Sequence, residues 1–432
     1  MATDAPRLGA WPAAARLIAR WLERSERLDT LLDTLPPELH GTERARCQHL
    51  VFGVVRHFGR LEAALARLVA HPPRFATRAV LFVAGFELID AAGEAVADGR
   101  VAKIVHHAVE QTKTLASPAE ARLVNAVVRK LAAALASPAP PAAAEPAQLA
   151  EYFSHPEWLV RAWLAQFGAE ATRALLEWNQ QPATVYARWR AAAEPPPDFL
   201  RPTKWPGFFE VASGHWAEVE PLLTTGKLYL QDPGTRLAVE LLAPQPGEAV
   251  LDLCAAPGGK SLLIADAMKS GRLVAMDLPG TRIDRLKENL ARVSGVDVAL
   301  VQADVLEGAE AALRAHQLPG SFAAVLIDVP CSNTGVMRHR ADVKWRLQAG
   351  DFKKHPQQQL AFLHAAARLV APGGRLVYST CSIDTEENER VVAEFFNSRA
   401  GGPFKLEAST LSFPWISGHD GGAAFLLRRK TP

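Results

Sequence analysis

The sequence predicts an α/β protein: a doubly wound sheet at the C-terminus, preceded by an all-α domain and a small mixed α/β region. Three observations support this fold class. Residues 1–135 carry apolar residues at helical spacing, for example in the segment 61–68. Four prolines between Pro138 and Pro146 then interrupt any helix. Beyond residue 236, short apolar runs alternate with helical patterns, which is typical of a parallel sheet flanked by helices.

These patterns divide the chain into four parts. The all-α domain spans residues 1–135, and an extended Ala/Pro-rich linker spans 136–147. Residues 148–235 begin with a helical pattern and continue with short, proline-rich extended pieces. In the last part, residues 236–432, strands are expected at 249–253, 272–276, 298–301, 323–327 and 375–379, and helices at 260–268, 281–293, 357–370 and 386–396.

Composition excludes several classes of protein. With 49% hydrophobic and 22% charged residues, the chain of 432 residues has the balance of a globular protein, which excludes wholesale disorder. Its 48 Lys and Arg against 46 Asp and Glu exclude a histone-like polycation but allow a local basic groove. Four cysteines without a Cys-x-x-Cys pair exclude a disulfide scaffold and a zinc ribbon. No apolar run is long enough to span a membrane, so we expect a cytoplasmic protein.

The first predicted strand of the C-terminal part leads into a glycine-containing loop that opens a helix. Gly258 and Gly259 allow a ligand to approach the backbone, and the helix start offers free N–H groups. Nucleotides bind at this crevice of doubly wound sheets. A phosphate-binding P-loop is an alternative, but that motif needs a glycine where Cys254 stands. We therefore favour a different nucleoside ligand.

Two aspartates follow the next two strands. Asp277 lies 19 residues beyond Gly258, where a carboxylate can accept both hydroxyls of a ribose. Asp304 ends the third strand and could bind an adenine amine. Either aspartate alone would be interpreted as a helix cap or turn residue. Together with the glycine loop they favour an adenosine-type ligand.

Two cysteines follow the fourth and fifth strands. Asp328 and Cys331 end one strand and Cys381 ends the other, so both thiols should reach the same crevice. Cys47 and Cys254 are interpreted as small buried hydrophobic residues. A thiol with an ordinary pKa of ~8.5 needs a cationic or dipolar neighbour to ionise. The basic residues that could supply this potential are Arg338, Arg340, Lys344 and Arg346.

A thiolate beside a nucleoside cofactor suggests one kind of chemistry. The C5 carbon of a pyrimidine is a poor nucleophile, but addition of a thiolate at C6 turns the ring into an enamine that can attack an electrophilic methyl group. A hydrogen bond at N3, a task suited to Asp328, would stabilise the developing charge. The C5 proton must then leave and the thiol must be eliminated, a step that a second cysteine could assist.

These residues resemble the Sun (Fmu/RsmB-type) family of RNA cytosine-C5 methyltransferases, which use S-adenosylmethionine and have a Rossmann-like fold. The loop Leu251–Ser261 is similar to the family's cofactor loop. Asp328–Trp345 resembles its Asp-Ala-Pro-Cys-Ser-Gly-Thr-Gly element, and Leu369–Ile383 with Glu386–Glu389 resembles its Thr-Cys-Ser element. The resemblance covers nearly the whole chain.

The N-terminal part also has a specific resemblance. Leu50–Arg56 and Leu123–Lys130 are similar to the NusB-like helical RNA-binding module that is fused to the RsmB-type branch. Ser154–Val160 resembles that branch's start of the middle region, so residues 148–235 would form a small RNA-binding subdomain. The resemblance implies a bacterial enzyme that acts on 16S ribosomal RNA. We further expect a monomer without a metal site.

The resemblance also assigns roles. Cys381 would be the nucleophile toward C6, Cys331 would assist release of the product, and Asp328 would hold the target base. The order of the two cysteines comes from the resemblance alone. S-adenosylmethionine would be bound by Cys254, Ala255, Ala256, Pro257, Gly258, Gly259, Lys260, Asp277, Arg282, Asp304 and Asp328.

The sequence departs from the family pattern at several positions. Val329 replaces the usual Ala, and Asn333 replaces the usual Gly or Ala. Where the family has Asp-Gly-Phe-Phe near the C-terminus, Gly422 and Ala423 follow Asp420-Gly421. The residues that carry the chemistry are intact, so these departures concern the target nucleotide more than the reaction.

A target base must be unpaired or flipped out to reach a thiol, and single-stranded RNA is bound by positive charge and aromatic stacking. The candidate RNA contacts near Cys331 are Arg338, Arg340, Lys344 and Trp345. A second candidate is Tyr186–Arg190, although Trp189 and Trp345 could belong to the core. A solvated surface is as good an interpretation as RNA contact for the basic residues of the all-α domain, Arg56, His57, Arg60, Arg122, Arg129 and Lys130.

Two rival functions belong to other classes. A non-catalytic RNA-binding or ribosome-assembly factor could keep the cofactor fold, but it would have no need for the pair Cys331 and Cys381. An amino-group methyltransferase would place an aromatic residue where Cys331 stands.

Overall fold

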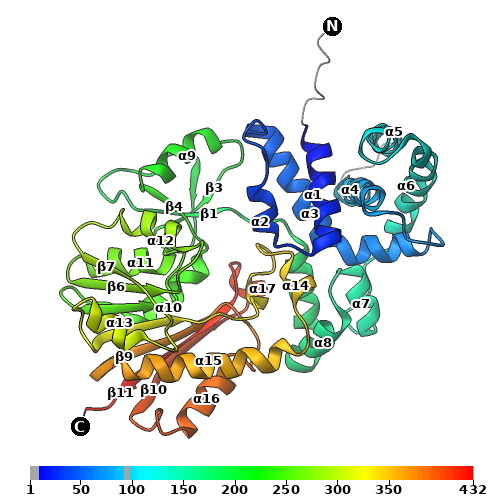
Figure 1. Ribbon diagram of the computed structural model, residues 1–432. Coiled ribbons are helices and arrows are strands. Elements are labelled where there is room, and N and C mark those ends of the chain that lie inside the picture. The colour runs from blue at the N-terminus through cyan, green and yellow to red at the C-terminus, as the bar shows by residue number, and fades with distance from the viewer. Residues whose placement is uncertain (1–8, 92–97, 432) are drawn as a thin grey trace. The chain divides into compact units, whose positions relative to one another are not determined.

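The computed structural model describes residues 9–91 and 98–431 (Figure 1). The chain divides into two compact units. Unit 1 comprises Met1–Pro182 together with the short segment Met337–Arg346, and unit 2 comprises Ala183–Val336 and Leu347–Pro432. The α/β fold class expected from the sequence is confirmed.

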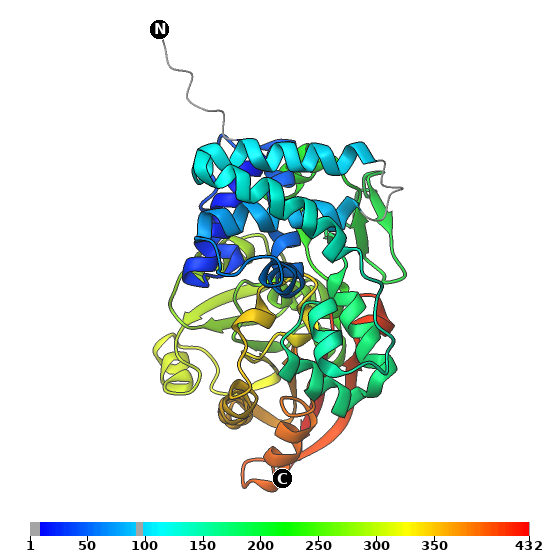
Figure 2. The same ribbon diagram turned by 90° about the vertical axis from the view of Figure 1, so that its right-hand side faces the viewer.

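The regular elements of unit 1, in its described residues, are all helices. Its helices are α1 (Ala10–Arg24), α2 (Leu28–Asp33), α3 (Gly41–Ala66), α4 (Phe75–Ala91), α5 (Asp98–Leu115), α6 (Ala121–Leu135), α7 (Pro146–Tyr152), α8 (Glu157–Gln180) and α14 (Val343–Arg346). The apolar α4 lies at the centre, because it packs against α1, α3, α5 and α6. Helices α5 and α6 run side by side (Figure 2). The sequence of α6 explains why it packs on the bundle with one face. Its buried side chains recur at helical spacing, as in Val124, Val127, Val128 and Leu131.

The division into units differs from the domains expected from the sequence. The predicted middle region, 148–235, is split at Pro182: α7 and α8 belong to unit 1, and the strands that follow belong to unit 2. The segment 337–346 lies within the predicted C-terminal domain but packs in unit 1, where Ala341 is fully buried in the core and Trp345 packs against it. Sequence order could not show this excursion.

Unit 2 contains two sheets. The smaller, antiparallel sheet has the order β2-β3-β1-β4, with β1 (Tyr186–Trp189), β2 (Leu200–Pro202), β3 (Phe208–Val211) and β4 (Leu228–Leu230). Helix α9 (Trp216–Thr224) packs beside β4. After β4, Asp232 accepts a hydrogen bond from Gly234 N and begins a short turn that leads into α10 (Arg236–Leu242).

The larger sheet has the order β10-β11-β9-β8-β5-β6-β7. Its parallel part contains β5 (Ala249–Leu253), β6 (Arg272–Asp277), β7 (Asp297–Gln302), β8 (Phe322–Asp328) and β9 (Val370–Thr380), at or near the five positions expected from the sequence. The sequence analysis did not predict two further strands, β10 (Phe404–Ser412) and β11 (Gly422–Arg429). β11 pairs antiparallel with β9, and β10 pairs antiparallel with β11.

Helices cover both faces of this sheet. On one face, α10, α11 (Gly259–Met268) and α12 (Ile283–Leu290) pack against alternate strand residues such as Val250 and Leu273. The other face, with Leu251 and Val274, is covered by α13 (Ala309–Ala315), α15 (Asp351–Arg368) and α16 (Glu389–Asn397). The resulting three layers place the carboxyl ends of the parallel strands at one edge, where the loops gather. A short helix, α17 (Pro414–Ser417), precedes β11.

Among the described helices, none combines the length and the apolar character needed to cross a membrane.

Candidate active site

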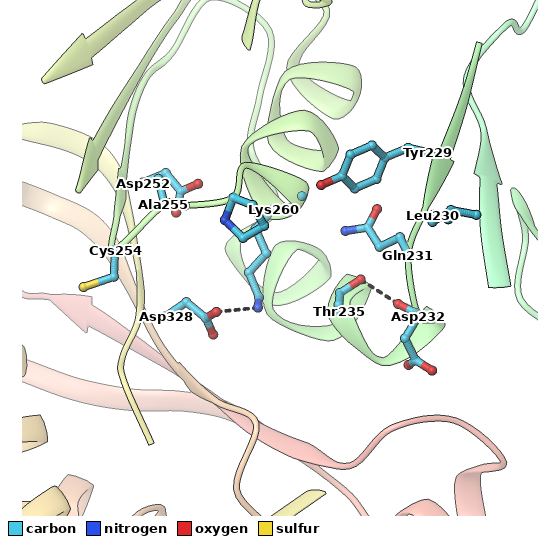
Figure 3. A pocket seen from close by; sticks show the side chains of 13 residues that line it. Tyr229, Leu230, Gln231, Asp232, Thr235, Asp252, Cys254, Ala255, Lys260 and Asp328 are labelled. Carbon is cyan, nitrogen blue, oxygen red and sulfur yellow. Dashed lines mark hydrogen bonds and ion pairs between the residues drawn. The ribbon is translucent and has the colours of Figure 1, made fainter. Parts of the chain in front are cut away.

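The loop between β5 and α11 forms one wall of a cavity of about 250 Å³ in unit 2 (Figure 3). Gly258 has a φ of +106°, which L side chains rarely adopt. At Gly259 an added Cβ would lie only 3.1 Å from Gln231 Nε2 and 3.3 Å from the Tyr229 ring. The two glycines therefore let the loop turn and let β4 and its following residues approach closely.

Seven of the predicted cofactor residues line this cavity: Cys254, Ala255, Ala256, Pro257, Gly259, Lys260 and Asp328. The opposite wall comes from the end of β4 and the turn after it. Tyr229, Gln231 and Asp232 stand there, and Figure 3 shows Tyr229 and Gln231 across the cavity from Asp328, with Lys260 between them. Sequence reasoning missed these residues. The Asp-Pro-Gly turn at 232–234 was the available signal that the chain changes direction here.

Four predicted cofactor residues do not line the cavity. Gly258 acts through the backbone turn. Asp277 is nearly fully buried and accepts hydrogen bonds from Ala256 N at 2.8 Å and Leu278 N at 2.7 Å, so it fixes the cofactor loop. Arg282 lies 3.6 Å from Asp277 Oδ1. Asp304 accepts from Leu306 N at 2.8 Å, as a turn residue does.

An ion pair lies at the inner end of the cavity. Lys260 Nζ is 2.7 Å from Asp328 Oδ2, and Ser379 Oγ donates to Asp328 Oδ1 at 2.9 Å. Burial alone would lower the pKa of Lys260, but the charge of Asp328 and its hydrogen bond outweigh burial and raise it. Lys260 is therefore a fixed cation at the point where the cofactor loop meets the ends of β8 and β9.

Cys331 and Cys381 meet beside this ion pair. Strands β8 and β9 are parallel neighbours in which Asp328 pairs with Ser379, so the loops that follow them start side by side. The two sulfur atoms lie 3.0 Å apart. The hydrogen bond with Cys381, and then burial, raise the pKa of the Cys331 thiol well above its usual value. Cys331 is thus held as a thiol that can donate to Cys381 Sγ.

A second, smaller cavity of about 60 Å³ opens at Cys381. Its lining includes Lys260, Ser379, Gly421 and Ala424. Gly335 connects the loops that carry Cys381 and Gly421. Gly335 N donates to Cys381 O at 3.0 Å, and Gly421 N donates to Gly335 O at 2.9 Å. An added Cβ at Gly335 would lie 2.4 Å from Gly421 O, so only glycine fits between the two loops. Cys381, the candidate nucleophile, lines this second cavity, and Thr235 and Lys260 line both cavities.

A buried carboxylate joins the two cysteine loops. Glu387 has no exposed surface and accepts from Ser332 N at 3.0 Å, from Ser382 Oγ at 2.8 Å and from Gln359 Nε2, on α15, at 2.7 Å. Burial alone would raise the pKa of Glu387, but the nearby His355 and the hydrogen bonds from Ser332 and Gln359 lower it below its usual range. His355 Nδ1 lies 3.6 Å away, and the pKa of this imidazole is raised in return.

The other two cysteines lack such partners. Burial, followed by the charge of Asp277, strongly raises the pKa of the Cys254 thiol, and burial raises that of Cys47 to about 11. Cys47 is a small buried hydrophobic residue, as expected, whereas Cys254 is only partly buried and lines the cofactor cavity.

The residues proposed to contact RNA fall into two groups. Lys344 is enclosed in unit 1, where its Nζ donates to Arg56 O at 2.9 Å, and Trp345 Nε1 donates to Val55 O at 2.8 Å. The Arg338 guanidinium lies over the Trp178 ring at 4.2 Å. These contacts anchor the segment 337–346, and an enclosed ammonium has no surface to offer to a phosphate. Arg340 remains exposed.

Other basic candidates separate in the same way. Arg56 is buried, whereas Arg122, Arg129 and Lys130 are exposed on α6. In unit 2, Arg188 and Arg190 both pair with Asp266 of α11. The Tyr186–Arg190 strand therefore attaches the small sheet to the larger one.

Two protein-family models match the chain. Residues 239–412 match the family described as 16S rRNA methyltransferase RsmB/F, and residues 12–133 match the NusB family. The chain is 31% identical over 401 residues to ribosomal RNA small subunit methyltransferase B of Sodalis glossinidius, covering 88% of both chains. It is 29% identical over 419 residues to the protein of that name in Yersinia enterocolitica, covering 92% of both.

Solved structures show the same fold. PH0851 superimposes with a TM-score of 0.76 at 21% identity, covering 98% of this chain and 99% of that one. NSun6 from Pyrococcus horikoshii, solved with SFG, gives a TM-score of 0.54 at 18% identity and covers 64% of this chain and 99% of its own.

Proposed function

The chain belongs to the RsmB/F family of 16S rRNA methyltransferases, and we propose that it methylates C5 of a cytidine in that RNA through a bond between Cys381 and C6. The cofactor is S-adenosylmethionine, which supplies an electrophilic methyl group when bound. The observation that carries the proposal is the 3.0 Å approach of Cys331 and Cys381 beside the Lys260–Asp328 pair.

The cavity at the cofactor loop suits an adenosine ligand with a charged tail. Its walls are backbone and small side chains on the α11 side, and a Tyr ring with an amide, Tyr229 and Gln231, on the other. Gly259 packs closely against Tyr229 and lines the cavity without a side chain of its own. We expect Tyr229 to pack on the nucleoside and Asp277 to act through the loop that it fixes.

The reaction would proceed as covalent catalysis. Cys381 loses its proton to solvent, and its sulfur bonds to C6 of the cytosine. The electron pair of the C5–C6 double bond would then form the new bond from C5 to the electrophilic methyl carbon that S-adenosylmethionine would supply, and the cofactor sulfur would keep the electron pair of its bond to that carbon. The Asp328 carboxylate accepts a hydrogen bond from the N4 amino group of the cytosine, and the neighbouring Lys260 cation stabilises the negative charge that the ring acquires. Loss of the C5 proton to solvent returns its electron pair to the ring, restores the C5–C6 double bond and expels the Cys381 thiolate, to which Cys331 can donate its proton.

Two measurements test the proposal. Incubation with methyl-labelled S-adenosylmethionine and unmodified 16S rRNA, followed by nucleoside analysis, should place the label in 5-methylcytidine. Label in an N-methylated base would instead support an amino-group methyltransferase.

The roles of the cysteines are tested by trapping. Cys331→Ala should accumulate a covalent protein–RNA adduct, because the final elimination is impaired, whereas Cys381→Ala should form none. An adduct with the Cys381 variant alone would reverse the two roles, and full activity of the Cys381 variant would refute the mechanism.

A further inference from the structure

Asn333 lies between the two cysteines and contacts both. Its Nδ2 donates to Cys331 O at 2.7 Å, and Cys381 Sγ lies 3.2 Å from its Oδ1. Its backbone N–H also donates to the Cys331 sulfur, which by itself would lower the pKa of that thiol. Among the described residues of this loop, Asn333 and Cys331 are the side chains that bond to the Cys381 sulfur.

The orientation of the amide follows from its partners. A backbone carbonyl can only accept a hydrogen bond, so the end of Asn333 that faces Cys331 O must be the NH₂ group. The oxygen then faces Cys381, and an amide oxygen can only accept. In this arrangement the Cys381 sulfur is the donor, and it therefore carries its proton.

The backbone conformation at position 333 favours Gly or Asn over other residues, but it does not distinguish between these two. Asn333 has a φ of +61°, in the left-handed region that glycine and asparagine tolerate best. Glycine, which is common here in the family element that this loop resembles, would satisfy the backbone equally well. The contact with Cys381 is what the side chain adds.

We propose that Asn333 is a positioning residue that holds the Cys381 thiol in its protonated form, turned toward Cys331, until a target base enters the cavity. A hydrogen-bond acceptor stabilises a thiol relative to a thiolate. The other titratable or charged groups that face this pair are Lys260, Asp328, Cys331 and Glu387. Lys260 is the cation of this group, and Asn333 Oδ1 accepts the hydrogen bond from the Cys381 thiol at 3.2 Å. The proposal rests on Cys381 being the nucleophile.

The test measures alkylation of the free protein by iodoacetamide, in which a thiolate displaces iodide and the thiol proton goes to solvent. Cleaved peptides are quantified by mass spectrometry, so that each cysteine is followed separately, over a range of pH. Asn333→Gly keeps the backbone conformation and removes the acceptor, so the Cys381 profile should move to lower pH. Loss of one net hydrogen bond of about 1 kcal/mol corresponds to roughly five-fold faster alkylation near neutral pH.

Asn333→Asp is the matched variant, because it keeps the shape and the acceptor but adds negative charge. Its Cys381 profile should move to higher pH, opposite to that of the glycine variant. The buried Cys47 should stay unmodified in both, which shows that the helical unit is intact.

Unchanged profiles, or shifts in the same direction, would overturn the proposal. Neither RNA nor S-adenosylmethionine is present, so this result is independent of the methylation assay. If methylation fails while the two profiles move apart, Asn333 still restrains Cys381, and the proposed function alone is refuted.

Discussion

At the residue scale, strand order was enough to bring the reacting groups together. Asp328, Cys331 and Cys381 each follow a strand of one parallel sheet, and β8 and β9 are neighbours, so the three side chains meet at one edge. Strand order says nothing of what lies across the crevice. Tyr229 and Gln231 come from a different sheet, and the contact of Asn333 with Cys381 depends on one side-chain rotamer. Such contacts require the tertiary structure.

Lys260→Met should abolish most of the activity. The substitution keeps the length of the side chain but leaves Asp328, 2.7 Å from the missing ammonium, without its ion pair and leaves the charge on the ring without a cation. Removal of one such stabilising group typically lowers kcat about 10²- to 10³-fold. Single-turnover methylation of RNA measures the effect. The control is Lys287→Met, at an exposed site on α12, and equal rates for the two variants would contradict the role of Lys260.

At the scale of elements, the active site depends on how two loops are attached to each other. The loop after β8 and the loop after β9 share Glu387 as a common acceptor, and Gln359 connects it to α15. Each cysteine sits one residue before a serine that Glu387 binds. The separation of the two sulfur atoms is therefore set by a group that touches neither of them.

Glu387→Gln tests this attachment. The amide has the same shape, but its NH₂ group cannot accept from Ser332, Ser382 or Gln359, so at least one loop must shift. A displacement of about 1 Å can cost roughly 10²-fold in rate. We expect kcat for RNA methylation to fall by about that factor while KM for both substrates changes little. Glu386→Gln is the neighbouring control, because Glu386 pairs with Arg390 of the adjoining helix α16 rather than with either cysteine loop's serine. A normal kcat in the Glu387 variant would show that the cysteine loops are held by other contacts.

On the scale of the whole molecule, unit 1 should lose stability in acid. His155 is buried, its Nδ1 faces Phe153 O at 2.6 Å, and Asn179 Nδ2 lies 3.2 Å from Nε2. Burial, together with the charge of Lys344, lowers the pKa of His155 well below 6.5. In mild acid, His155 therefore binds a proton in the unfolded chain but not in the folded unit.

The sign follows from this difference. Stability is present above the unfolded pKa of ~6.5 and declines as pH falls below it, by up to ~1.4 kcal/mol per pH unit for one histidine. Hydrogen exchange of the α8 amides, corrected for intrinsic rates, should show lower protection at pH 5.5 than at pH 7.5. His155→Asn should reduce this difference, and the exposed His71→Asn should not. An unchanged acid response in the His155 variant would assign the effect to other groups.

The five parallel strands and most helices around them were predictable, because buried strands and amphipathic helices carry periodic signals that do not depend on distant contacts. Two features were not. Strands β10 and β11 pair antiparallel at the sheet edge. β10 is largely polar, and the apolar run 423–427 of β11 was not identified as a strand from the sequence. The segment 337–346 carries the charges of a surface, yet it buries Lys344 and Ala341 in unit 1.

That excursion of the chain has a consequence for biosynthesis. The helices of unit 1 leave the ribosome first, but the ten residues that complete their core follow about 155 residues after Pro182. At ~5–20 residues per second, synthesis of the intervening residues takes roughly 10 to 30 s. During this time the nascent bundle lacks the segment 337–346. Its final consolidation must coincide with synthesis of the loop that bears Cys331, so a truncated product that ends before Met337 contains neither a finished bundle nor the nucleophile.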